Sequence, residues 1–326
     1  RRGAGQARRC PADRRRTRGT APSIRQSGAT AAPRSGAEAM ATATDRQLDL
    51  FRAVRGDIAP RDAQDLMSWP FFSLAKSKRV APIRFRMGEV WIEVEATHEH
   101  GMATIWDADI LIWAASQIVE ARDAGRGTSR LMQAKPHELL RFIGRGTGGD
   151  HYDRLKAALD RLQSTTVATS IRQTSERRRH RFSWINEWKE HLDGQGRARG
   201  IELILPDWFY AGILDRALIL TIDRSYFALT GGMERWLYRL VRKHGGRQVN
   251  GWSFEVGHLH LKSGMLIPRK RFAFKLRAIV SAQSLPGYLL SLQTVAGKDM
   301  LLFQPLALDP FDRALRRVRH GRGEKR

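Results

Sequence analysis

A basic segment without acids is the part of the sequence with the clearest chemical meaning. Residues 256–298 contain no Asp or Glu, although acids make up 33 of the 326 residues of the chain. The same segment holds Lys262, Arg269, Lys270, Arg271, Lys275, Arg277 and Lys298. Cations gathered without counter-charges suit the phosphates of a nucleic acid, whereas an ordinary solvated helix mixes both signs.

Most of these cations fall on one predicted helix. Pro268 suits a first helical turn, and residues 269–282 then follow a helical pattern. At about 100° per residue, one side of this helix is apolar and carries Phe272, Leu276, Ile279 and Val280. The opposite side carries Lys270, Arg271, Lys275 and Arg277. We predict that the apolar side packs on the protein, and that the basic side, with Arg269, contacts DNA.

A second motif, His258-Leu259-His260, could support different chemistry. Two histidines two residues apart on a strand can hold one cation, and Tyr288 could then act as the nucleophile of a DNA-nicking enzyme. However, we predict a helix over residues 254–262, where such a pair diverges, and no acidic ligand lies nearby in sequence. We therefore predict no catalytic residue, no metal and no cofactor, and keep a metal-dependent nickase as an alternative.

Composition narrows the partners further. A formal net charge of +24 favours a polyanion. No apolar run approaches the roughly 20 residues of a membrane span, so we predict no membrane partner. The chain has no G-x-x-x-x-G-K-[ST] loop, and the glycine-rich residues 144–149 are expected to form a turn. Its single cysteine, Cys10, fits a reducing, cytoplasmic setting.

The elements of the first half follow a recognisable order. A hairpin is predicted from residues 83–87 and 90–94, and helices from about Thr104, from Pro136 and from Asp150 as N-cap. Strands at 167–172 and 181–187 then enclose a polar tip with Arg177, Arg178 and Arg179. Three helices followed by a hairpin with a basic tip are typical of a winged helix.

We expect the basic tip of that hairpin to contact phosphates or the minor groove. The third helix of the first half also carries Arg154, Lys156 and Arg161, which could contact DNA. Asp153 and Asp160 dilute this set, so a solvated or dimer-facing helix is the alternative.

The second half repeats this order. Residues 201–205 read as a strand and 207–214 as a helix, and a helix following Gly231 and Gly232 ends at Gly245. Arg235, Arg239 and Arg242 are expected to cover the outer side of that helix. The helices 254–262 and 268–282 come next, and 288–294 with 300–303 form a hairpin. The predicted fold class is α+β, with two tandem winged-helix domains and small antiparallel sheets.

These elements divide the chain into five segments. Residues 1–39 hold ten arginines against Asp13 and Glu38 and cannot form a core, so they are a basic arm or an over-extended gene start before Met40. We expect the over-extended gene start. Residues 40–59 form a linker, 60–195 the first winged-helix domain, 196–308 the second, and 309–326 a basic tail.

Several longer motifs resemble one family. Gly101 to Trp113 (GMATIWDADILIW) resembles the first-domain motif of the replication initiator protein A family of bacterial plasmids. The same holds for Arg61 to Met67 (RDAQDLM) and Pro70 to Leu74 (PFFSL), and in the second half for Glu234 to His244 (ERWLYRLVRKH) and Leu285 to Tyr288 (LPGY).

The resemblance, which covers about residues 45–306, implies a plasmid replication initiator. Such a protein would bind double-stranded origin DNA and recruit a host initiator and the replicative helicase. Its second domain would read repeated sites, and its first would contribute to a homodimer. A winged-helix transcriptional repressor is the alternative among DNA-binding proteins.

Overall fold

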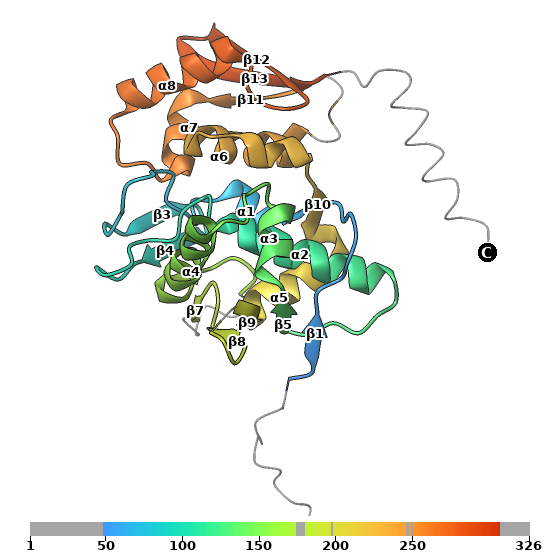
Figure 1. The fold of residues 1–326 in the computed structure, drawn as a ribbon. Helices are drawn as coiled ribbons and strands as arrows, with labels where there is room; N and C mark the ends of the chain where they lie inside the picture. The colour runs from blue at the N-terminus through green and yellow to red at the C-terminus, as the bar shows by residue number, and fades with distance from the viewer. Residues whose placement is uncertain (1–47, 174–179, 197, 246–247, 249–250, 307–326) are drawn as a thin grey trace, which may run out of the picture. The chain divides into compact units, whose positions relative to one another are not determined.

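The computed structural model of the chain describes residues 48–173, 180–196, 198–245, 248 and 251–306 (Figure 1). These residues belong to one compact unit, Gln47–Arg326, and the account below concerns that unit alone. The basic ends of the chain and the predicted tip residues Arg177, Arg178 and Arg179 lie outside the described residues.

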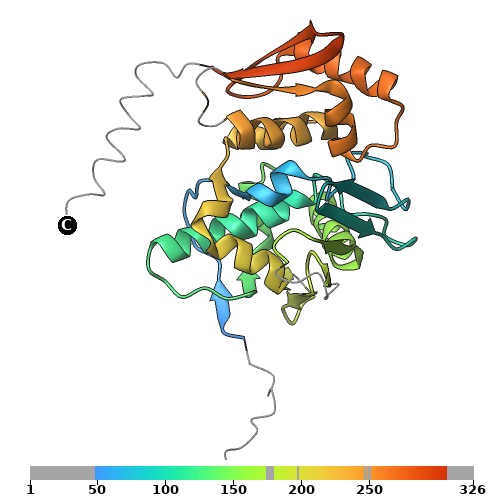
Figure 2. The same ribbon diagram turned by 180° about the vertical axis from the view of Figure 1, so that it is seen from behind.

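The second half forms a winged helix. Its elements in chain order are α6 (Gly232–Gly245), β11 (Trp252–Glu255), α7 (Val256–Ser263), α8 (Arg269–Ala282), β12 (Tyr288–Val295) and β13 (Lys298–Pro305). The strands form an antiparallel sheet in the order β11-β13-β12, and α6 lies beneath it (Figures 1 and 2). The predicted helix 254–262 thus begins later than expected, because its first residues extend β11.

The first half contains the same arrangement. Its elements are α2 (Ala108–Asp123), β5 (Leu131–Ala134), α3 (Pro136–Phe142), α4 (Gly149–Ser164), β8 (Glu187–Leu192) and β9 (Ala198–Ile204). These strands have the order β5-β9-β8, with β1 (Leu50–Arg52) added in parallel to β5. The predicted fold class of two winged helices is therefore confirmed. We call α2 to β9 the first winged helix and α6 to β13 the second.

The wing of the first winged helix is not the hairpin that the sequence indicated. The predicted strands do form β6 (Thr166–Thr169) and β7 (Arg181–Ser183), but they join β3 (Ile83–Met87) and β4 (Val90–Glu95) in a separate sheet, β3-β4-β6-β7. The wing hairpin is β8–β9, and β6–β7 is an insertion before it. Alternation along a strand shows which side is buried, not which strand is its partner.

The strand β9 also corrects the predicted assignment of residues 201–205 to the second half. It pairs with β5 and β8 of the first winged helix. The next helix, α5 (Asp207–Leu214), packs against α2. Two 3-10 helices, η1 (Arg216–Leu218) and η2 (Arg224–Ala228), flank β10 (Ile219–Thr221), which pairs with β2 (Arg61–Ala63). These segments after residue 196 therefore also pack on the first half.

Two helix starts differ from the sequence prediction. The helix expected from about Thr104 begins at Ala108, after a turn in which the backbone N–H of Thr104 donates to Asp107 Oδ2 over 2.8 Å. Gly148, not Asp150, is the N-cap of α4. Asp150 lies in the first turn of that helix, where a negative charge favours the helix dipole.

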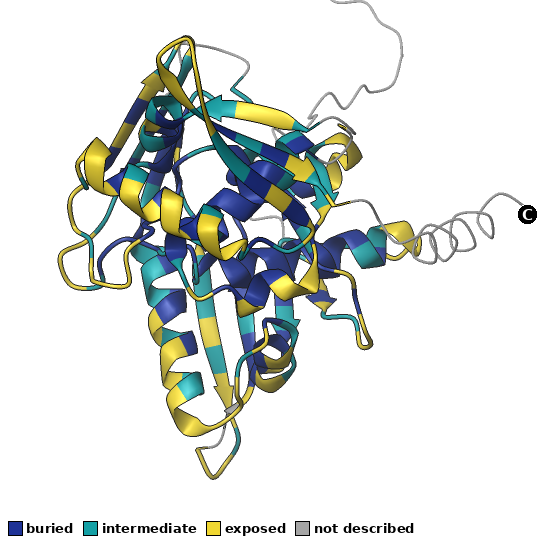
Figure 3. Cartoon of the chain, turned by 90° about the horizontal axis from the view of Figure 1, so that it is seen from above, coloured by how far each residue is buried: buried dark blue, intermediate teal, exposed yellow. Residues whose placement is uncertain are grey.

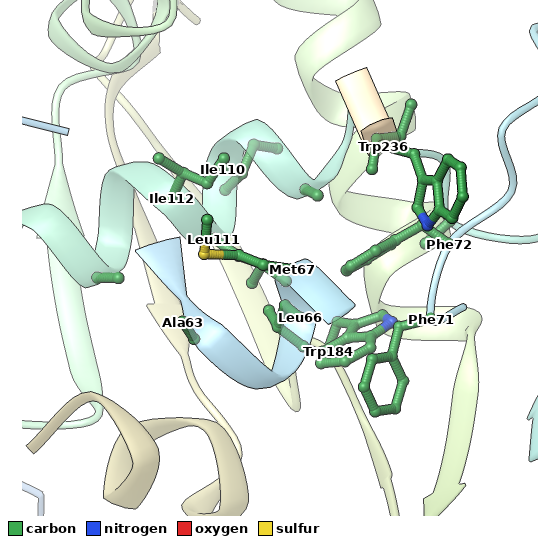
Figure 4. Close-up of a cluster of buried hydrophobic side chains, with 14 of the residues drawn as sticks. Ala63, Leu66, Met67, Phe71, Phe72, Ile110, Leu111, Ile112, Trp184 and Trp236 are labelled. Atoms are coloured by element: carbon green, nitrogen blue, oxygen red, sulfur yellow. The ribbon is translucent and has the colours of Figure 1, made fainter. Parts of the chain in front are cut away.

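The core is continuous between the two halves. The short helix α1 (Gln64–Ser68) packs against α6, and Phe72 stacks on Trp184 at 4.9 Å between ring centroids (Figure 4). Trp113 and Trp236 are buried in this core. Burial is concentrated where helices face sheets, and exposed residues follow the outer turns (Figure 3). Within the described ranges, no helix combines the length and apolarity needed to span a membrane.

Candidate nucleic-acid interface

The basic helix α8 has the two sides that the sequence predicted. Phe272 and Leu276 are fully buried and Ile279 nearly so. Phe272 packs edge-on against Trp236 of α6, with ring centroids 6.3 Å apart, and lies 5.2 Å from the ring of His260 of α7. The predicted basic residues Arg269, Lys270, Arg271, Lys275 and Arg277 are all exposed. Two neighbouring helices therefore fix α8 so that its cations point to solvent.

The cations differ in how far they are neutralised. Arg269 lies 3.8 Å from Glu255, and Arg277 lies 3.7 Å from Asp299, in exposed and weak ion pairs. For Lys270, Arg271 and Lys275, the described part of the chain supplies no acidic partner. The first three turns of α8 thus present positive charge to an external anion.

An exposed aromatic residue lies among these cations, and the sequence analysis did not identify it. The Phe274 side chain is 70% exposed. At about 100° per residue it lies roughly 160° from both Phe272 and Leu276, at the centre of the outward side. The signal was present in the sequence, because an apolar residue two positions from each of two core residues cannot share their side of a helix.

The turn before α8 is attached to the first half of the chain. Gly264 ends α7 in a left-handed conformation with φ +61°, and Arg79 Nη1 donates to its carbonyl over 2.7 Å. A Cβ at Gly264 would lie 2.9 Å from Pro70 Cβ. These contacts hold α7 and leave the outward side of α8 uncovered.

Lys262, a member of the acid-free basic segment, belongs to this attachment rather than to the exposed set. Its Nζ lies 4.2 Å above the ring of Trp69, and the residue is 5% exposed. Burial, with Lys243 nearby, lowers the pKa of Lys262 to about 8. Its charge therefore faces the protein and not a ligand of α8.

The third helix of the first winged helix, α4, uses its charges internally. Lys156 Nζ lies 2.9 Å from Glu190 of the wing strand β8, and Trp188 of the same strand donates to Asp160 over 3.1 Å. Arg161 donates two 2.8 Å hydrogen bonds to Asp107, which raise the pKa of the guanidinium. Of the cations predicted on this helix, Arg154 is exposed and has no acidic partner within the described ranges.

Two arginines of α6 overturn a prediction. Arg235 and Arg239 were expected on the outer side of this helix, yet each is 1% exposed. Arg235 Nη1 donates to both carboxylate oxygens of Asp109, at 2.7 and 2.8 Å, and Arg239 pairs with Asp62 at 2.6 and 2.9 Å. The pattern of a helix cannot distinguish an arginine facing a buried carboxylate from one facing water.

These pairs connect α6 to β2 and α2 across the two halves. Burial raises the pKa of Asp109 to about 6, although Arg235 and Arg145 favour its charged form. The third arginine of the predicted set, Arg242, is half-buried and donates to the carbonyl of Thr221 over 2.9 Å. The prediction is therefore wrong for Arg235 and Arg239, whereas Arg242 keeps part of its side chain in solvent.

The histidine motif is placed on α7, as predicted. His260 Nε2 lies 2.7 Å from the carbonyl of Ile267, and the ring of His258 stacks on Phe254. Tyr288 is buried against Tyr238, and burial raises the pKa of its hydroxyl. Within the described residues, no three His, Cys, Asp or Glu side chains gather as a metal site would require.

Comparison with known proteins assigns the class of this tandem winged-helix protein. Residues 61–290 match the family described as Replication initiator protein A. A relative from Wigglesworthia glossinidia brevipalpis, named "Putative replication protein", is 30% identical over 228 residues, which cover 68% of this chain and 81% of the relative. The chain belongs to the replication initiator protein A family.

Solved structures show the same fold at low identity. A crystal structure of domains 2 and 3 of RctB is 16% identical, with a TM-score of 0.55, and the match covers 73% of this chain and 95% of that one. A second crystal structure of RctB domains 2-3 is 15% identical, with a TM-score of 0.50, covering 75% and 97%. At this identity the likeness concerns the fold.

Proposed function

We propose that the protein initiates plasmid replication by binding double-stranded origin DNA, with the outward side of α8 in the major groove. The observation that carries this proposal is the uncompensated charge of Lys270, Arg271 and Lys275 on the third helix of a winged helix. In this fold the third helix is the one that enters the groove. Family membership supports the replication role.

Two kinds of DNA contact would have different roles. Phosphate contacts would position the protein, and two or three side chains of α8 would read base edges. Lys298, at the start of the second strand of the hairpin β12–β13, lies 3.2 Å from Glu255 and is therefore a weaker candidate for a backbone contact. Arg269 and Arg277, already near Glu255 and Asp299, would add less than the three unpaired cations.

The first winged helix would serve a different role. Its α4 holds Lys156 in an internal ion pair, so we propose that it faces protein, in a homodimer or with the host initiator and replicative helicase that the family resemblance implies. Arg177, Arg178 and Arg179 would supply phosphate contacts from the β6–β7 connection. Arg154 would contribute at most one contact of this kind.

A binding measurement tests the proposal directly. DNase footprinting on the DNA that flanks the gene locates the site, and replacement of Lys270, Arg271 and Lys275 together by Ala should abolish the footprint. Replacement of Lys156 by Ala is the control, because this cation of α4 is already paired with Glu190, and it should preserve the footprint. A triple variant that folds and keeps its footprint would exclude α8 as the reading helix.

We further propose that binding occurs without strand cleavage. His258 stacks on Phe254, His260 lies 2.7 Å from the carbonyl of Ile267, and the Tyr288 side chain is buried, so this set is not arranged to attack a DNA strand. Supercoiled origin DNA incubated with the protein and Mg²⁺ or Mn²⁺ should stay supercoiled. Nicked product that disappears in a Tyr288→Phe variant would establish the nickase alternative. Loss of plasmid maintenance on deleting the gene would separate an initiator from a repressor.

A further inference from the structure

The ring of Phe274 lies outside the core. It lies diametrically opposite the buried residues Phe272 and Leu276 and is 70% exposed, more than any other large apolar residue of the described chain. A single exposed apolar residue is ordinary on a protein surface, so the weight falls on the position of Phe274 among the exposed cations of α8. The side chains around this ring indicate which kind of partner would cover it.

The surroundings of Phe274 favour DNA over protein. One turn before it lie Lys270 and Arg271, and Arg277 lies one turn after it. Next along the same side are the exposed small residues Ala278 and Ser281, which would let another surface approach the helix closely. A protein partner would have to neutralise these cations, whereas phosphates on either side of a groove do so without further charged groups.

An apolar group in the centre of a basic reading helix has one clear counterpart in the major groove. Hydrogen-bonding side chains recognise G, C and A there, but the 5-methyl group of thymine is the apolar feature of the groove, and apolar side chains such as Phe contact it. Lys270 and Arg271 could bind phosphates or guanine edges beside it. A phenyl ring flanked by donors thus matches a thymine flanked by acceptors.

We propose that Phe274 determines sequence preference by packing against the 5-methyl group of a thymine in the origin site. This inference rests on the proposed function of α8. It adds that the recognised sites contain a thymine at the position facing the centre of the helix. Contact with that methyl group contributes specificity, while the neighbouring cations contribute most of the affinity.

The experiment removes the methyl group and the ring separately. The full chain selects duplexes from a random-sequence pool, and each thymine of the selected site is then replaced in turn by deoxyuridine, which lacks only the 5-methyl group. Wild-type protein should lose about three- to tenfold in affinity at one or two positions. Phe274→Ala should bind the all-thymine site less tightly and show less than about a twofold loss at the same positions.

Matched variants keep the test interpretable. Leu261→Ala removes another exposed apolar side chain, 55% exposed on the neighbouring helix α7, and should keep the wild-type uridine profile. Phe274→Leu should retain part of the effect. Because Phe274 lies outside the core, thermal unfolding of these variants should match wild type.

The outcomes separate this inference from the proposed function. If Phe274→Ala keeps the same uridine losses, or if wild-type protein is insensitive at every thymine, the inference is overturned. An altered sedimentation coefficient of Phe274→Ala with an unchanged uridine profile would also overturn it, by assigning the ring to a protein contact. If the triple Lys270, Arg271 and Lys275 variant binds normally, the proposed function itself fails.

Discussion

The two winged helices share one topology but differ in what their wings place beside the third helix. In the first winged helix, strand β8 places Glu190 beside Lys156 and Trp188 beside Asp160. These charged side chains of α4 are therefore bound within their own domain. In the second, α8 meets acids of the hairpin region only near its ends, at Glu255 and Asp299. The distribution of acids, and not the fold, decides which third helix presents uncompensated positive charge to solvent.

The comparison also shows that the two copies are not independent modules. The first helix of the second copy, α6, holds Arg235 and Arg239 buried against Asp109 and Asp62 of the first half. A buried ion pair is costly to break by removing one partner, because the other charge stays buried. The repeat is thus joined through two charged contacts and a continuous core.

The largest effect is expected from breaking one of these pairs. Asp62→Asn leaves Arg239 buried without a counter-charge and should lower the free energy of unfolding by about 3–5 kcal/mol. Asp57→Asn is the control, since that carboxylate is 92% exposed in its pair with Arg224 and should matter little. Urea unfolding measures both. Equal midpoints for the two variants would show that the buried pair does not hold the halves together.

A smaller effect should follow from giving the second copy the acidic character of the first. Ala278 is exposed on the outward side of α8, so Ala278→Glu adds an acid without removing a cation or touching the core. Repulsion from phosphates should weaken origin binding by about 1–3 kcal/mol. Ala278→Gln is the neutral control of similar size. Titration of labelled origin DNA distinguishes them, and equal affinity of the two variants would contradict the comparison.

The third prediction concerns the phosphate contacts assigned to the first half. Replacing Arg177, Arg178 and Arg179 together by Ala should weaken binding to origin and random DNA alike, because phosphates carry no sequence information. The slope of log affinity against log salt should decrease by up to about 2.7 if all three contact phosphates. Salt titrations on both DNAs measure this. A change in base preference instead would mean that the roles of the two halves are reversed.

The smallest effect concerns the pH dependence of stability, through His244 of α6. Burial, with Lys262, Lys243 and His258 nearby, lowers the pKa of His244 to about 4, from 6.5. The unfolded chain therefore binds a proton that the folded protein excludes, and stability falls as pH drops from 6.5 towards 4.

A His244→Gln variant isolates this contribution. The difference in unfolding free energy between wild type and variant should shift against wild type between pH 7 and pH 5. The shift should be below about 1 kcal/mol, because the histidine is only half-buried and solvent screens its charge. Parallel urea titrations at the two pH values measure it. If the difference in unfolding free energy between wild type and His244→Gln does not change with pH, His244 is not the titrating group.

Much of this fold followed from the sequence, and the errors have a common cause. Helix α5 was predicted at its observed bounds, and Phe272, Leu276 and Ile279 of the predicted apolar side of α8 are buried, with Val280 partly so, because helical periodicity is local. The wing of the first copy and the burial of Arg235 and Arg239 were wrong, because both depend on contacts far apart in sequence. Strand β9 finds its partner β5 more than sixty positions away.

In the candidate site, too, local spacing could be predicted from the sequence and long-range contacts could not. Which cations lie on the outward side of α8 could be predicted from spacing alone. Which of them are compensated could not, because Glu255 and Asp299 reach Arg269 and Arg277 from other strands. Lys262 entered the predicted basic segment by sequence, but its packing on Trp69 turns it inward.

The paired arginines of α6 have a geometric consequence for the DNA itself. Because the first helix of the second copy is bonded to the first half, α8 and the insertion hairpin cannot rotate apart without uncovering two ion pairs. The two winged helices would therefore keep a fixed separation and orientation. On the proposed function, DNA contacts made by the two winged helices would have to lie at one fixed helical phase, so inserting half a turn of DNA between them should be tolerated far less than inserting a whole turn.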